Sequence, residues 1–270
     1  MSDAGPRPRL LATDLDGTFL RSDGTVSERT ARVWAALPHS GVETVLVTAR
    51  PPRWLHDLAH VVGAHGIAIC ANGAFVYAVE QREVIETHCF EPAVLAGIIE
   101  DLRAAVPGVM LATETAAGAV FEESWPDRHR DASTRHAPVG DVDVLLAEPV
   151  GKLLALAPGL ATETFLRVVR DIVADRGRLA YSGALGLAEI NASGVTKAAA
   201  LERWSVERRI SARFVWAFGD MPNDLPMIEW AGRGIAVANA HPDVLAAADA
   251  VAPSNDDDGV AVTAEPLLRS

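Results

Sequence analysis

The sequence RLLATDLDGT at residues 9–18 places a short apolar run directly before two aspartates, Asp14 and Asp16, and the glycine Gly17. The run has the length and composition of a buried strand, and side chains two positions apart on a strand point the same way, so we expect both carboxylates to face one side. Ligands bind at the carboxyl ends of strands in open α/β sheets, and a glycine lets the backbone turn there. A capped turn without chemistry is the alternative interpretation.

Similar apolar runs lie on both sides of a long middle region. They cover residues 43–48, 67–70, 214–218 and 235–237, and helix-like patterns separate them. Near-continuous apolar strands that alternate with helices are typical of a parallel sheet covered on both faces. We therefore predict an α/β fold with a doubly wound, Rossmann-like parallel-sheet core.

The pattern changes between residues 79 and 183. Amphipathic helices are predicted at 91–106 and 162–176, and strands at 142–148 and 152–157. The simplest organisation is a core domain formed by residues 1–78 and 186–270, interrupted by an inserted α+β cap domain over residues 79–185.

Composition excludes several classes of protein. The 270 residues include 24 basic and 36 acidic side chains, for a net charge of −12, with no basic stripe of the kind that binds nucleic acid. No apolar stretch approaches the roughly 20 residues that a membrane span needs, no secretory signal is visible, and two cysteines are too few for a disulfide framework. We expect a cytoplasmic globular protein that binds neither nucleic acid nor membrane, and the sequence is compatible with a monomer.

A second acidic cluster, GDMPND at residues 219–224, follows the apolar run RFVWAF and precedes a predicted helix. Carboxylates from two strand ends supply the hard oxygen ligands that Mg²⁺ prefers. Because adjacent like charges disfavour ionisation, we expect the pKa of either Asp14 or Asp16 to rise, giving a carboxylate nucleophile beside a carboxylic acid. An Asx-rich loop with a helix cap is the structural alternative for GDMPND.

An acidic protein that binds a phosphate ester needs local positive charge or directed donors. Thr48 ends the apolar run VLVT, where its hydroxyl could donate to a phosphoryl oxygen. Lys197 stands at the start of a predicted helix, where its ammonium and the helix dipole both favour an anion. Each residue taken alone is more often an ordinary surface or cap residue.

Four segments together resemble the motifs of the haloacid dehalogenase-like hydrolase superfamily. In chain order they are DLDGT (14–18), VTAR (47–50), GVTK (194–197) and GDMPND (219–224), and VTAR has alanine where the family's TGR has glycine. The large insertion between the second and third segments resembles the C2-capped branch. The segments NGA (72–74), EIN (189–191) and AVANA (236–240) are similar to the Cof-type sugar-phosphatase group.

The resemblance implies a mechanism and a metal. Asp14 would attack phosphorus to form an aspartyl-phosphate, and Asp16 would protonate the leaving oxygen and activate water. Mg²⁺ would be held by the Asp14 carboxylate, the Asp16 backbone carbonyl and the Asp220 carboxylate, with Asp224 ordering the site. Thr48, Lys197 and Asn223 would bind the phosphoryl group.

The function that follows is a Mg²⁺-dependent phosphatase acting on small phosphorylated metabolites such as sugar phosphates. A phosphotransferase or phosphomutase that uses the same intermediate is a close alternative, and a non-catalytic phosphoacceptor or sensor is a more distant one. Three residues are candidates for contact with the substrate: Arg50, Asn72 and Lys152. Each of these could equally be an ordinary surface contact.

Overall fold

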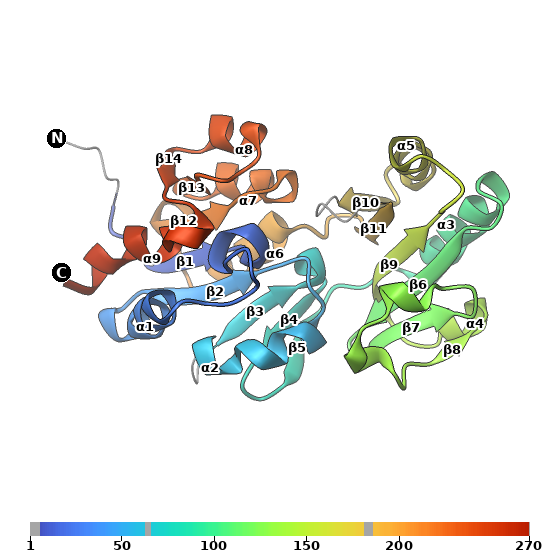
Figure 1. Cartoon of the computed structure of the whole chain (residues 1–270), viewed down its shortest axis with the longest axis horizontal. Coiled ribbons are helices and arrows are strands. Elements are labelled where there is room, and N and C mark those ends of the chain that lie inside the picture. The colour runs from blue at the N-terminus through green and yellow to red at the C-terminus, as the bar shows by residue number, and fades with distance from the viewer. Residues whose placement is uncertain (1–5, 63–65, 181–185, 270) are drawn as a thin grey trace.

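The computed structural model describes residues 6–62, 66–180 and 186–269, and in these ranges the strands form two sheets (Figure 1). The first sheet has eight strands in the order β14-β13-β12-β1-β2-β3-β4-β5. These strands are β1 (Leu10–Thr13), β2 (Glu43–Val47), β3 (Ile67–Cys70), β4 (Phe75–Ala78), β5 (Glu83–Thr87), β12 (Val215–Gly219), β13 (Arg233–Val237) and β14 (Ala250–Ala252). The runs predicted to be core strands therefore all fall in one sheet.

The centre of the first sheet is parallel. β1 runs between β12 and β2, with Leu10 beside Val215 on one side and Glu43 on the other. The strands β3, β13 and β14 continue the parallel arrangement, whereas β4 and β5 form an antiparallel edge.

Helices cover both faces of the first sheet. They are α1 (Glu28–Ala36), α2 (Ala59–Val62), α6 (Lys197–Glu207), α7 (Leu225–Trp230), α8 (Pro242–Ala247) and α9 (Gly259–Ala264). Because side chains alternate along β1, Leu10 and Ala12 belong to the apolar cluster that includes α6 and α7, while Leu11 belongs to the cluster that includes α1 and α9. The predicted doubly wound parallel core is confirmed. In the described ranges, none of the helices is both long enough and apolar enough to cross a membrane.

The second sheet is inserted in the chain between β5 and β12. Its order is β10-β11-β9-β6-β7-β8, formed by β6 (Met110–Thr115), β7 (Gly118–Glu122), β8 (Val139–Gly140), β9 (Val150–Leu156), β10 (Gly177–Ala180) and β11 (Leu187–Ala192). Helices α3 (Pro92–Ala105) and α5 (Thr162–Val173) pack together beside it (Figure 1). Leu153 and Ala155 of β9 join the apolar cluster of these helices, and the alternate residues Lys152 and Leu154 line a cavity on the other face.

Three details of the sequence prediction need correction. The strand predicted at 142–148 is the short helix α4 (Val142–Leu145), because Asp141 caps its first turn and the apolar residues three apart face the core. Two strands also pair across the boundaries predicted between the core and cap domains, at 78/79 and 185/186. β5 pairs with β4 in the first sheet, and β11 pairs with β9 in the second. Residues 181–185, next to the second boundary, lie outside the described residues.

Candidate active site

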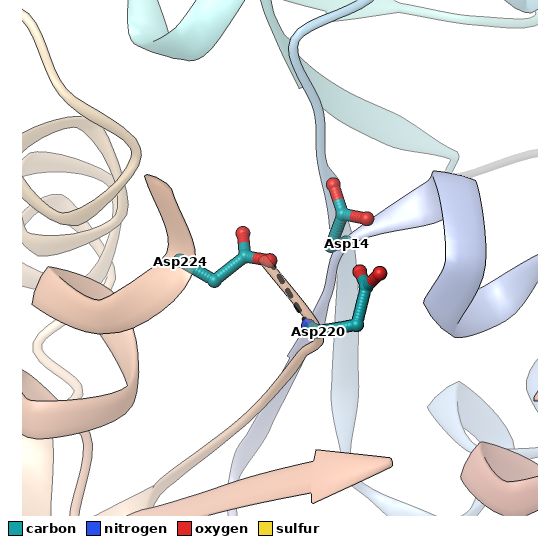
Figure 2. A group of neighbouring side chains, drawn as sticks. All are labelled: Asp14, Asp220 and Asp224. Atoms are coloured by element: carbon teal, nitrogen blue, oxygen red, sulfur yellow. Dashed lines mark hydrogen bonds between the residues drawn. The ribbon is translucent and has the colours of Figure 1, made fainter. Parts of the chain in front are cut away.

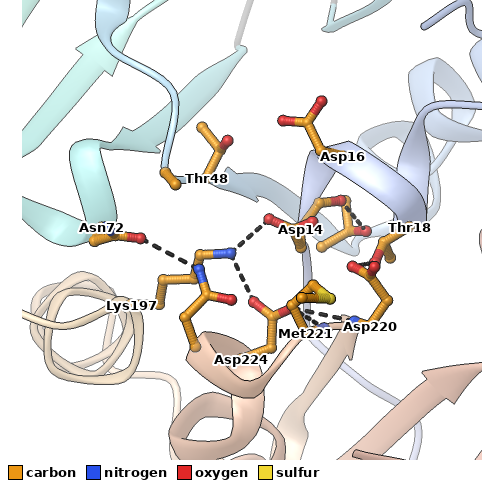
Figure 3. Close-up of polar contacts among 12 residues, drawn as sticks. Asp14, Asp16, Thr18, Thr48, Asn72, Lys197, Asp220, Met221 and Asp224 are labelled. Carbon is orange, nitrogen blue, oxygen red and sulfur yellow. Dashed lines mark hydrogen bonds and ion pairs between the residues drawn. The ribbon is translucent and has the colours of Figure 1, made fainter. Parts of the chain in front are cut away.

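Asp14 lies at the carboxyl end of β1, in the middle of the parallel sheet. Its backbone N–H donates to the Phe218 carbonyl of β12 at 3.0 Å, which fixes the residue directly beyond the strand end. The side chain is buried, and its Oδ1 accepts a hydrogen bond from the Lys197 ammonium at 2.5 Å (Figure 3). Lys197 is also buried, at the first position of α6. The structure thus places a carboxylate and an ammonium together at a point where ligands bind in α/β sheets.

Asp220 and Asp224 follow β12 and complete a group of three buried carboxylates with Asp14. Each residue has one carboxylate oxygen that lies within 4.8 Å of such an oxygen on the other two (Figure 2). Asp224 Oδ1 accepts from Lys197 at 2.6 Å, and its Oδ2 accepts from the backbone N–H groups of Asp220 and Met221, both at 3.1 Å. Asp220 Oδ1 accepts from the Thr18 hydroxyl at 2.8 Å. Asp224 therefore fixes both the lysine and the loop that carries Asp220.

Burial and crowding shift the titration of this group. Burial raises the pKa of Asp14 well above its usual range, Lys197 opposes that rise, and the like charges of Asp224 and Asp220 add to it. Burial also raises the pKa of Asp220 to about 6, against the opposing hydrogen bond from Thr18. For Lys197, burial lowers the pKa, but Asp14 and Asp224 outweigh it and the net shift is upward. The lysine is therefore a fixed cation among carboxylates of increased proton affinity.

Gly17 is needed for this arrangement. Its φ of +80° lies in the left-handed region, and a Cβ at this position would lie 2.4 Å from Asp220 Oδ2. Only glycine lets the turn after β1 pass this close to the second acidic loop.

The Asp16 carboxylate does not face the same side as the Asp14 carboxylate, although the strand pattern predicted that it would. Its carboxylate receives two hydrogen bonds from the Arg50 guanidinium, at 2.8 and 2.5 Å, and its side chain is 56% exposed. The strand ends at Thr13 and the chain turns through Leu15–Phe19, so the two-residue alternation does not extend to position 16. The like charges that raise the pKa of Asp14 come from Asp224 and Asp220, whereas the sequence argument assigned that effect to the pair of Asp14 and Asp16.

Thr48, Asn72 and Asn223 are linked in a chain of contacts beside Lys197. The Thr48 carbonyl accepts from the Asn72 backbone N–H at 2.9 Å, and the Thr48 hydroxyl accepts from the Arg50 backbone N–H at 3.1 Å. Asn223 Nδ2 donates to Asn72 Oδ1 at 3.4 Å, and the buried Asn223 Oδ1 has no partner in the described part of the chain. Asn72 has a φ of 58° and lies between two further residues of positive φ, a backbone conformation found at functional sites.

Lys152 is not a free cation. Its ammonium lies 2.5 Å from Glu189 Oε2 and donates to the Ala49 carbonyl at 2.8 Å, so it joins the second sheet to the loop after β2. Asn191 makes a similar link, since its Nδ2 donates to the carbonyls of Ala71 and Gly151 at 2.9 and 3.0 Å.

A cavity of about 450 Å³ is lined by residues of both sheets and their loops, and Asp14 of the three buried carboxylates is part of the lining. The first sheet, its loops and α6 contribute Asp14, Asp16, Arg50, Lys197 and Asn223 to the lining. Asn72 instead lines a smaller neighbouring cavity of about 170 Å³, together with Lys197 and Asn223. The main cavity therefore brings together most of the residues singled out in the sequence.

Sequence reasoning missed several other residues that line this cavity. From the segment after β2 these are Arg53 and Trp54, and from the second sheet and its loops they include Glu114, Phe121, Trp125 and Asp131. Arg53 forms an ion pair with Glu114, and Trp54 Nε1 donates to Asp131 Oδ2 at 2.7 Å. The only local signal was the density of tryptophan and arginine in PPRW (51–54) and WPDRHR (125–130).

Comparison with known proteins identifies the family. The protein-family model described as haloacid dehalogenase-like hydrolase matches residues 11–263, and the chain belongs to this family. A 5-amino-6-(5-phospho-D-ribitylamino)uracil phosphatase from Bacillus subtilis is 29% identical over 262 residues, which cover 94% of this chain and 96% of the relative. A pyridoxal phosphate phosphatase from Escherichia coli is 27% identical over 268 residues, with the same two coverages.

Solved structures share the whole fold. A phosphatase of the haloalkanoate superfamily from Bacteroides thetaiotaomicron has a TM-score of 0.81 at 23% identity, covering 99% of this chain and 97% of its own. A subclass IIB sugar phosphatase of the superfamily has a TM-score of 0.78 at 20% identity, covering 96% of this chain and 98% of its own. This chain is thus an enzyme of a hydrolase family, and the two relatives above are named as phosphatases.

Proposed function

We propose that this chain hydrolyses small phosphorylated metabolites through a phosphorylated Asp14. The observation that carries the proposal is the position of the Asp14 carboxylate, which is buried in contact with Lys197 and lines a cavity together with Asp16. A carboxylate nucleophile beside a fixed cation and an accessible second carboxylate is the combination that covalent phosphoryl transfer requires.

The reaction has two steps. An Asp14 oxygen attacks phosphorus, the bond from phosphorus to the leaving oxygen breaks, and Asp16 gives that oxygen its proton. Asp16 then takes a proton from water, whose oxygen attacks the aspartyl-phosphate and releases inorganic phosphate with Asp14 restored. Lys197, Thr48 and Asn223 hold the phosphoryl oxygens, and Arg50 orients Asp16 through their paired contact.

The acidic group fits a divalent cation. One oxygen of Asp14 and one of Asp220 lie within 4.8 Å of each other, and burial raises the pKa of both carboxyl groups. Buried carboxylates this close together favour a bound cation, so Asp14 and Asp220 would hold Mg²⁺, together with the Asp16 carbonyl that the family resemblance implies. Both oxygens of Asp224 are already engaged, which suits it to ordering the site. When bound, the ion would neutralise charge on the phosphoryl group.

We predict that Mg²⁺ stabilises the protein more at neutral than at acidic pH. Without the ion, Asp220 keeps its proton in the folded chain up to a pH of about 6, whereas in the unfolded chain it loses the proton near pH 3.8. The folded state therefore binds more protons between these two pH values, and the free energy of unfolding falls as pH rises through this window. The cation needs the carboxylates, so the rise in melting temperature on adding Mg²⁺ should be larger at about pH 7.5 than at about pH 5. Asp220→Asn should lose most of this rise, and equal rises at both pH values would contradict the assignment.

We propose that the second sheet with α3, α4 and α5 acts as a cap over the site. It supplies one wall of the cavity, and the Lys152 and Asn191 contacts hold it against the core loops. Such a cap would exclude water and contact the leaving group. Cytoplasmic residence and a monomeric state stay predictions.

The test of function is phosphate release from a panel of small phosphate esters, with and without Mg²⁺. We expect turnover that requires Mg²⁺, and transfer to an added sugar hydroxyl would favour the phosphotransferase alternative. A stable phosphorylated chain without turnover would favour the phosphoacceptor alternative. No phosphate release and no labelling of the chain would contradict the proposal.

A further inference from the structure

The part of the cavity lining that comes from the segment after β2 and from the second sheet is rich in aromatic side chains. Trp54, Phe121 and Trp125, here called the aromatic wall, belong to it together with Leu154 and Leu187. The rings of Phe121 and Trp125 are 5.9 Å apart between centroids, and both residues are buried. Trp54 is 44% exposed, although its indole N–H is fixed by Asp131. The Arg53 guanidinium carbon lies over the Trp54 ring, 5.6 Å from its centroid, so the exposed part of this fixed indole is the flat surface that a ligand can contact.

Polar side chains beside the aromatic wall are bonded mainly to one another. Arg53 pairs with Glu114, Lys152 pairs with Glu189, and Trp54 pairs with Asp131. A sugar or polyol presents hydroxyl groups along its length, and each needs a partner once it leaves water. Side chains that are already paired offer a polyol few partners, so these three pairs favour a leaving group that needs fewer hydrogen bonds.

Trp125 has a polar group that remains unpaired. Its indole Nε1 is buried and has no hydrogen-bond acceptor in the ranges that the structure describes. Leaving a buried donor unpaired is unfavourable, whereas an acceptor atom on a bound ligand would satisfy it. Arg53 Nε and Arg130 Nε, in the same lining, are also unpaired in the described ranges. Flat apolar faces beside unpaired donors match a heteroaromatic ring, whose faces are apolar and whose edge carries acceptor atoms.

We infer that the preferred substrate is a phosphate ester whose leaving group carries a heteroaromatic ring. The ring contacts the aromatic wall, stacks on Trp54, and accepts a hydrogen bond from Trp125. This inference rests on the proposed phosphatase function and makes it more specific, because it separates ring-bearing esters from simple sugar phosphates.

The first test compares kcat/KM for pyridoxine 5′-phosphate and ribose 5-phosphate, since pyridoxine lacks an aldehyde that could react with lysines. We expect the wild type to prefer the ring-bearing ester by about tenfold or more, the usual scale of ring stacking on an aromatic side chain. Trp54→Leu keeps an apolar side chain but loses the flat ring, and should reduce the preference by about tenfold. The matched control Trp54→Phe keeps the ring and should retain most of the preference.

A second test needs no variant. Pyridoxine without phosphate should inhibit ribose 5-phosphate hydrolysis competitively, and ribitol at the same concentration should not. If ribose 5-phosphate is the better substrate and pyridoxine does not inhibit, the inference is wrong while the phosphatase proposal stands. If neither ester nor p-nitrophenyl phosphate releases phosphate with Mg²⁺, the proposed function itself fails.

Discussion

Replacing Asp14 with Asn is expected to lower the rate of phosphate release by about a thousandfold or more, the scale of losing a catalytic nucleophile. The amide has nearly the shape of the carboxylate but cannot attack phosphorus. It also removes one of three crowded negative charges, and burial raises the pKa of the Asp14 carboxyl, so the variant should still fold. Phosphate release under saturating Mg²⁺ measures the loss, and a thermal melt checks folding.

A matched control makes the same change away from the cavity. Asp171 is an exposed residue of α5, and Asp171→Asn should leave phosphate release at the wild-type rate. If Asp14→Asn kept more than about a tenth of the wild-type rate while folded, another group would have to be the nucleophile.

Replacing Lys197 with Met is expected to lower both stability and turnover. The ammonium lies within 2.6 Å of the carboxylates of Asp14 and Asp224, and all three residues are buried. Removing one partner of a buried ion pair leaves uncompensated charge, which typically costs about 3–5 kcal/mol of folding free energy. Urea unfolding in the absence of Mg²⁺ measures this cost, and Lys197→Arg, which keeps the charge, should lose less.

A double variant separates charge from packing. Lys197→Met combined with Asp224→Asn removes a positive and a negative charge together, so it should recover part of the stability lost in the single variant. Wild-type stability in Lys197→Met alone would show that the buried contact contributes little, and would remove the argument that Lys197 is a fixed cation in the site.

The core strands and the site loops could be predicted because their signals are local. Each apolar run is continuous in sequence, and Asp14, Thr48, Lys197 and Asp220 all lie near strand ends or at a helix start. Parallel strands bring such positions to one edge of the sheet, so their convergence follows from the fold.

The orientation of Asp16, the helix at 142–145 and the aromatic wall depend on contacts that sequence spacing does not encode. Asp16 turns toward Arg50 because the strand ends first. The wall forms only when Trp54 from the loop after β2 meets Phe121 and Trp125 of the second sheet and its following loop. The pairings of β5 and β11 cross the predicted domain boundaries because a strand's composition does not reveal its partner.

The central claim is that the Asp14 carboxylate becomes phosphorylated, and chemical trapping tests it most directly. The enzyme is mixed with substrate and Mg²⁺, stopped during turnover, and treated with borohydride, which reduces an acyl phosphate to an alcohol. Peptide mass spectrometry should find homoserine in place of Asp14 in the wild type, and no such change in Asp14→Asn. Trapping at a different residue, or an unmodified Asp14 under conditions that trap an acyl phosphate elsewhere in the chain, would contradict the account.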